Sequence, residues 1–125
     1  MTAKEQLKLA KKHLFRVQEA WDPPEWDDLS LYGFYCLENA VTAAATHAKI
    51  SFNKKSHPGK AEAARQLARQ YGLPDVENLL KDLNEARKSE AYGDIAAPDL
   101  DAEDVASEIE SYVGAVEAFL NEAMS

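Results

Sequence analysis

Residues 27–50 read DDLSLYGFYCLENAVTAAATHAKI, and this stretch decides the fold that we predict for the chain. Asp27 and Asp28 suit the start of a helix, because a carboxylate there caps free backbone amides and opposes the helix dipole. Apolar residues then cover most of the helix circumference in its first half. We therefore predict a helix over residues 27–50 that either forms the centre of a bundle or faces a second subunit. Its main apolar stripe consists of Leu31, Phe34, Val41, Ala45 and Ala48.

The segments on either side have helical spacing, and no part of the sequence shows strand-like alternation. Pro23 and Pro24 end the first of these segments, since proline cannot continue a helix. Gly72 suits a helix C-terminus, and Asp75 and Asp101 suit the caps of the two helices that follow. The predicted helices cover residues 3–21, 27–50, 60–71, 76–92 and 102–125, with loops over 51–59 and 95–99.

These elements predict one all-α domain over residues 1–125, an up-and-down four-helix bundle plus one short helix. The only cysteine, Cys36, cannot form an internal disulfide, and its apolar neighbours indicate a buried small hydrophobe. No apolar run approaches the roughly 18 residues of a membrane span, and the N-terminus has no signal-peptide pattern. We therefore expect a cytoplasmic protein without a membrane partner.

Charge is distributed unevenly along the chain. The net charge is −8, but residues 1–72 hold eleven Lys/Arg and eight Asp/Glu, whereas residues 73–125 hold three and fourteen. An acidic protein is a poor general binder of nucleic acid. The charged residues are therefore interpreted first as solvated faces of a bundle. A local basic surface formed by the first predicted helix and the lysines near residues 54–60 is the alternative interpretation.

Arg87 is the clearest candidate functional residue, because it stands where a core residue is expected. Turning about 100° per residue from Val76, Arg87 falls at about 20° and Glu90 at about −40°, in the middle of the apolar stripe. A charged group there is costly unless it is paired or faces a partner surface. Glu38 also lies near an apolar stripe, on residues 27–50. Pairing of Glu38 or Glu90 with Arg87 is the simplest expectation.

The sequence predicts no metal site and no cofactor. His13, His47 and His57 have no neighbouring Cys, Glu or Asp at zinc-site spacing. Di-metal bundles need Glu-x-x-His repeats, and the residue three after Glu38 is Val41. Phosphate-binding glycine loops and nucleophile elbows are also missing from the sequence.

The end of the fourth predicted helix carries a resemblance to a known family. The pattern is formed by Leu83, Arg87, Ala91, Tyr92, Gly93 and Asp94, and residues 55–59 add the string KSHPG around His57. This combination resembles small bacterial and archaeal HEPN proteins, the higher eukaryotes and prokaryotes nucleotide-binding domains. The resemblance implies a helical bundle that forms a homodimer. It also implies a small nucleotidyltransferase as partner, in a toxin–antitoxin pair, and a nucleotide or RNA as ligand.

The chain departs from the family pattern where that pattern would support catalysis. Many HEPN proteins are metal-independent ribonucleases that use an Arg-x(4–6)-His motif, and the chain has Tyr92 five residues after Arg87 in place of a histidine. A tyrosine, with an ordinary pKa of about 10, is a poor general base. We therefore predict no catalytic residue at this position. The predicted binding or interface residues are Arg87, Glu90, Tyr92, Asp94, Glu38 and His57.

Three functions follow as hypotheses. The first is a HEPN-like homodimeric nucleotide- or partner-binding protein without nuclease activity. The second is a metal-independent HEPN ribonuclease toxin, in which His57 or His47 replaces the missing base. The third is an unrelated helical-bundle adaptor protein.

Overall fold

The computed structural model describes residues 1–92 and 100–122, with the backbone alone at residues 89–92. Within these ranges the chain is all-helical, as predicted, apart from an isolated β-bridge between Trp21 and Pro24. The helices are α1 (Ala3–Ala20), α2 (Trp26–His47), α3 (His57–Tyr71), α4 (Glu77–Tyr92) and α5 (Ala102–Glu122).

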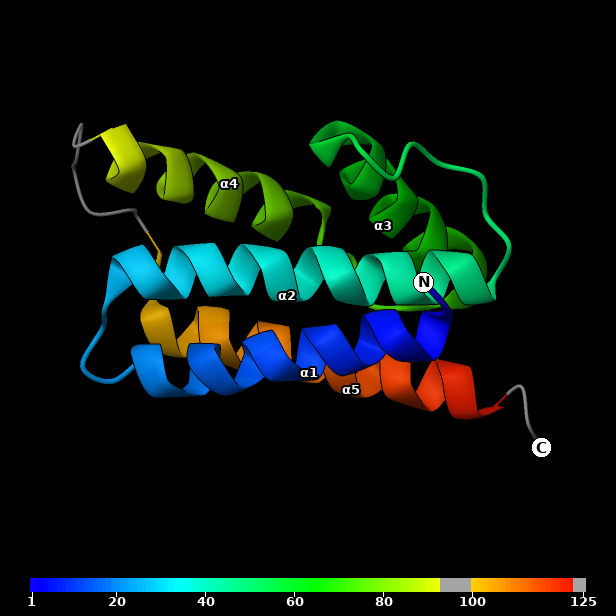
Figure 1. Cartoon of the computed structure of the whole chain (residues 1–125), viewed down its shortest axis with the longest axis horizontal. Helices are drawn as coiled ribbons and strands as arrows, with labels where there is room; N and C mark the ends of the chain where they lie inside the picture. Colours follow the sequence, from blue (N-terminus) through cyan, green and yellow to red (C-terminus); the bar gives the residue numbers. More distant parts are fainter. Residues whose placement is uncertain (93–99, 123–125) are drawn as a thin grey trace.

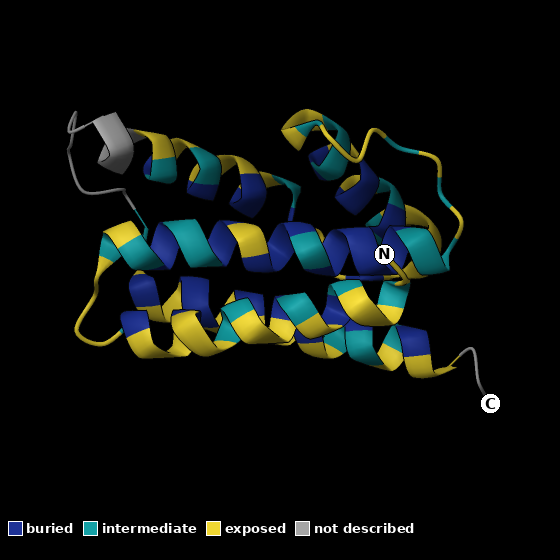
Figure 2. Ribbon diagram, viewed as in Figure 1, coloured by how far each residue is buried: buried dark blue, intermediate teal, exposed yellow. Residues whose placement is uncertain are grey.

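α2 is the central helix of the bundle. α1 and α5 run along one side of it, and α3 and α4 follow one another along the other side (Figure 1). Most of α2 is buried, in contrast to the half-exposed helices around it (Figure 2). The other helices of the same chain therefore cover the apolar circumference of α2, and its predicted central position is confirmed. The fully buried side chains of α2 include Leu29, Phe34, Cys36, Leu37 and Val41.

Asp101 caps α5 as predicted, whereas Asp75 lies one residue before the cap position of α4, which begins at Glu77, and still binds its first amide. Asp75 Oδ1 accepts from the Glu77 amide at 3.0 Å, and Asp101 Oδ1 accepts from the Asp104 amide at 3.0 Å. Each short carboxylate satisfies one amide that has no partner within its helix. Gly93, which follows the predicted helix 76–92, and the predicted loop 95–99 lie outside the described residues.

The start of α3 corrects the sequence prediction. Residues 57–59 were expected in a loop, but α3 begins at His57. The Ser56 hydroxyl accepts from the Gly59 amide at 3.1 Å, and Pro58 lies in the first turn, where its missing N–H costs nothing. In the sequence, Pro58 and Gly59 resemble a turn, and this pattern hides the cap formed by Ser56. The result is that His57 stands on a helix rather than on a loop.

The end of α2 also differs from the prediction, since the helix stops at His47 instead of residue 50. Lys49 has a φ of 59°, in the left-handed region. Its amide donates to Thr46 O at 3.2 Å, and the Ile50 amide donates to Ala45 O at 2.9 Å. These two bonds form a Schellman motif, in which glycine is the preferred residue at the left-handed position.

Cys36 is buried, as predicted. Its Sγ lies 3.1 Å from the carbonyl oxygen of Ala10 on α1, and burial raises the pKa of the thiol to about 12. A thiol with this pKa is not ionised at neutral pH, and the thiolate is the nucleophilic form. Cys36 is therefore a packing residue between α1 and α2. None of the described helices combines the length and the apolar composition needed to cross a membrane.

We expect the substitution Lys49→Gly to stabilise the fold. Glycine adopts a positive φ without the steric cost that lysine has, which stabilises the folded state by about 1 kcal/mol. The greater conformational entropy of glycine in the unfolded chain offsets a smaller part of this gain. Urea denaturation followed by circular dichroism measures the difference. The control is Lys54→Gly in the following loop, and an equal effect of the two substitutions would refute the expectation.

Candidate functional site

The candidate site is built around Glu38, a buried carboxylate in the middle of α2. Only 4% of Glu38 is exposed. Its Oε2 lies 2.6 Å from His57 Nδ1, and its Oε1 accepts from Lys60 Nζ at 3.4 Å. A buried carboxylate is costly unless charged or hydrogen-bonding groups surround it, and both partners here come from the first turn of α3. The contacts therefore join α3 to α2 at one polar point within the core.

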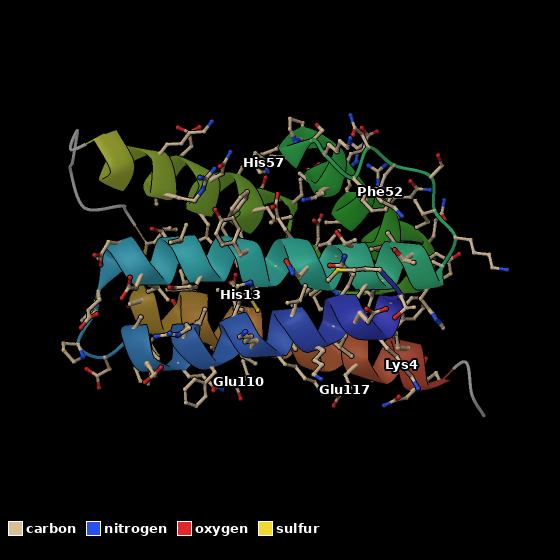
Figure 3. The ribbon with its side chains drawn as sticks, viewed as in Figure 1. Lys4, His13, Phe52, His57, Glu110 and Glu117 are labelled. Carbon is tan, nitrogen blue, oxygen red and sulfur yellow. The ribbon has the colours of Figure 1, made fainter. Side chains whose placement is uncertain are left out.

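His57 is held by this carboxylate and remains accessible to solvent. A carboxylate only accepts hydrogen bonds, so the proton of the His57 ring lies on Nδ1 and points to Glu38. The ring also packs edge-on against Phe34, with centroids 5.0 Å apart, and the side chain is 45% exposed. Figure 3 shows His57 in the space between α3 and α4, above α2. The second ring nitrogen, Nε2, is consequently available to a ligand.

Arg87 approaches the same phenylalanine from α4. Its guanidinium carbon lies 4.9 Å from the centroid of the Phe34 ring, and its Nη2 donates to Asn84 Oδ1 at 2.7 Å. Its Nε is buried and has no hydrogen-bond partner among the described residues. The arginine thus faces α2, as its place in the apolar stripe indicated. The predicted pairing with Glu38 is wrong, because α3 supplies both partners of that carboxylate.

A small cavity lies at the junction of α2, α3 and α4. Its volume is about 100 Å³. Sites for drug-sized ligands are roughly 300 Å³ or larger, so this cavity suits a group of a few atoms, such as a phosphate. Its lining consists of Phe34, His57, Pro58, Ala61, Leu80, Lys81 and Asn84.

The electrostatics of the site favour an anion. Lys81 and His57 line the cavity, and Arg87, which is not a lining residue, bonds to the lining residue Asn84. Among the described side chains of this cluster, the only acid is Glu38, and it is turned toward His57 and Lys60. Arginine presents several donors that match the oxygens of a phosphate, and a positioned histidine can exchange a proton. Within residues 1–92 and 100–122, no group of three His, Cys, Asp or Glu side chains could hold a metal ion.

The remaining candidate residues either lie away from this site or are not described in the structure. The side chains of Glu90 and Tyr92 are not described, and Asp94 is outside the described residues. His47 packs edge-on against Phe119 of α5, with centroids 5.2 Å apart. His13 is half-buried, and burial together with the charge of Lys12 lowers its pKa.

Three contributors were not predicted from the sequence. Lys60 comes three residues after His57 and shares its helix face once α3 starts at residue 57. Asn84 comes three residues before Arg87 and shares its face in the same way. Phe34 was assigned to the core, where it does lie, but its contacts with His57 and Arg87 also depend on the packing of three helices.

Comparison of the chain with protein-family models, with curated proteins and with solved structures finds no match. The site therefore has to be interpreted from its own geometry.

We expect Glu38→Gln to lower the free energy of unfolding by about 2 kcal/mol, because the half-buried Lys60 ammonium loses a charged hydrogen-bond partner. Urea denaturation measures the change. The matched control is Glu62→Gln on the outer face of α3, where the carboxylate is 73% exposed and pairs with Arg65 at 3.8 Å. An exposed pair of this kind contributes about 0.5 kcal/mol or less. Equal losses for the two variants would show that the buried carboxylate does not anchor α3.

Proposed function

We propose that the chain is a HEPN-like nucleotide-binding protein in which Arg87 and His57 bind the phosphate of a nucleotide or RNA. One observation carries the proposal. Arg87 and the Glu38-held His57 contact the same Phe34 ring beside a cavity of about 100 Å³. Both groups therefore lie against one aromatic side chain, and His57 and Asn84, the hydrogen-bond partner of Arg87, line the same cavity.

The buried Nε of Arg87, which has no partner among the described residues, supports this assignment. A buried N–H without a partner costs about 1–3 kcal/mol, and a bound phosphate oxygen would recover that cost. A guanidinium binds phosphate through two parallel hydrogen bonds, which lysine cannot do. Arg87 uses Nη2 for Asn84, and we assign its other donors to the oxyanion.

The family resemblance adds two partners to the proposal, a second copy of the chain and a small nucleotidyltransferase. These partners rest on the sequence pattern from Leu83 to Asp94 alone. They stay predictions, as does the toxin–antitoxin role.

Binding at the site is tested with adenosine monophosphate and followed by the NMR signals of the His57 ring. We expect the nucleotide to shift these signals and adenosine, which lacks the phosphate, to leave them unchanged. Arg87→Ala should weaken binding at least about tenfold, because a charge-assisted contact contributes about 1.5–3 kcal/mol.

Two further variants control this experiment. Arg69→Ala removes an exposed arginine near the end of α3 and should bind adenosine monophosphate like the wild type. Arg87→Lys keeps the positive charge but lacks the paired donors of the guanidinium. It therefore distinguishes a loss of phosphate contacts from a loss of folding. Unchanged affinity in folded Arg87→Ala, or equal shifts with adenosine, would refute the phosphate site.

Metal-independent RNA cleavage is a second candidate, and the contact between Glu38 and His57 favours it. The Glu38 carboxylate binds Nδ1 of His57 and so positions Nε2 as a general base or acid. His57 would therefore supply the proton-transfer group that the chain lacks at Tyr92, where the family motif has a histidine. Arg87 would then stabilise the negative charge that develops on the phosphate.

The cleavage hypothesis predicts that the protein cuts an unstructured RNA in the presence of EDTA. A gel of end-labelled RNA measures this activity. His57→Asn should abolish it, and Glu38→Gln should reduce it about tenfold or more, since each variant removes one part of the acid–base pair. His47→Asn, away from the site, should cut normally. Intact RNA after incubation with the wild type would leave binding as the function.

A further inference from the structure

A continuous band of aromatic and basic side chains runs from the candidate site across α2 to α1. Phe34 contacts Tyr35 at 6.0 Å between ring centroids, and Tyr35 contacts His13 of α1 at 5.9 Å. His13 in turn stacks on Tyr32 at 6.0 Å with an interplanar angle of 28°. The guanidinium of Arg16 lies 5.6 Å from the centroid of Tyr32 and ends the band.

The helix geometry explains why these residues meet. Tyr32 and Tyr35 are three residues apart on α2 and therefore share a face, as do His13 and Arg16 on α1. α1 packs along α2, which places His13 between the two tyrosines. Figure 3 shows His13 below α2 and His57 above it, at similar positions along the helix. The band thus crosses α2 instead of following it.

The outer part of the band is open to solvent. Tyr35 is 37% exposed, Arg16 is exposed, and Tyr32 and His13 are half-buried. Phe34, by contrast, is 1% exposed, so it supports His57 and Arg87 but cannot itself stack on a ligand. A base that lies near the phosphate site would meet Tyr35 first and the His13–Tyr32 pair next.

We propose that this band binds single-stranded RNA, whose bases stack on Tyr35 and on the Tyr32–His13 pair while a phosphate occupies the Arg87–His57 site. The proposal rests on the proposed phosphate site and adds the substrate class and its path. Stacking on aromatic rings contributes about 1–3 kcal/mol per base, and it needs unpaired bases. A base-paired duplex does not present its base faces in this way.

The charges around the band agree with a polyanion along part of its length. Lys12 lies close enough to His13 to affect its titration, and Arg16 stands at the far end. Glu19, Glu25 and Asp28 border Arg16 and Tyr32 on the far side of that end. These acids repel phosphates, so the path stops at Arg16.

The experiment measures the binding of fluorescein-labelled U12 RNA by fluorescence anisotropy, in parallel with adenosine monophosphate binding at His57. We expect U12 to bind at least about tenfold more tightly than uridine monophosphate, because several bases stack at once. The same sequence annealed to A12 should bind more weakly than the single strand.

Single substitutions locate the path. Tyr35→Leu keeps an apolar side chain and removes the ring, and we expect it to weaken U12 binding at least about fivefold without changing adenosine monophosphate binding. The matched control is Tyr71→Leu on α3, which removes a tyrosine that is 45% exposed and packs on Phe119. Arg16→Ala should weaken U12 binding and reduce its salt dependence, whereas Arg69→Ala should do neither.

The outcomes separate the two proposals. If adenosine monophosphate binds but U12 binds no more tightly than uridine monophosphate, or if Tyr35→Leu and Tyr71→Leu have equal effects, the RNA path is refuted and the phosphate site stands. If adenosine monophosphate does not bind and U12 binding still depends on Tyr35, the phosphate site is refuted and the band keeps its role. Tighter binding of the duplex than of the single strand would also refute the path.

Discussion

α2 has apolar side chains around most of its circumference, and water on any one side of it would leave a large apolar surface exposed. Burying this surface is the main favourable contribution that the chain can gain on folding. The chain covers α2 with α1 and α5 on one side and α3 and α4 on the other. The remaining helices need only one apolar face each, and their outer faces carry the charge of the protein. The arrangement of the other helices around α2 follows from the need to bury its apolar surface.

Glu38 restricts which helix can pack against the middle of α2. A carboxylate inside an apolar surface must be neutralised by neighbours, and only the helix that supplies His57 and Lys60 meets this condition. The first turn of α3 therefore has one favourable position against α2. The same contact that satisfies the carboxylate also orients the His57 ring toward the junction with α4. A requirement of folding and the geometry of the candidate site are thus met by the same three side chains.

The position of α4 has a related consequence. α4 packs on α2 and α3, and Leu83 is one of its fully buried residues. Arg87 lies one turn further along the same face, where the apolar stripe would continue. The helix thereby brings a guanidinium onto Phe34 and beside the histidine of α3. The proposed phosphate site and the aromatic band both depend on Phe34, which touches residues from α3, α4 and its own helix.

The sequence by itself determined the helical class, the apolar character of α2, the cap at Asp101 and the burial of Cys36, because these follow from local spacing and from single residue types. It also singled out Arg87 and Glu38, since a charge near an apolar stripe is visible in the sequence, whereas His57 was a candidate through the family resemblance. It did not determine which of them meet. The pairing of Glu38 with His57 rather than Arg87 depends on how α3 and α4 approach α2, and on a Ser56 cap that moves His57 onto a helix. Only the tertiary structure decides contacts between residues that are far apart in the chain, because the geometry of helix packing sets those distances.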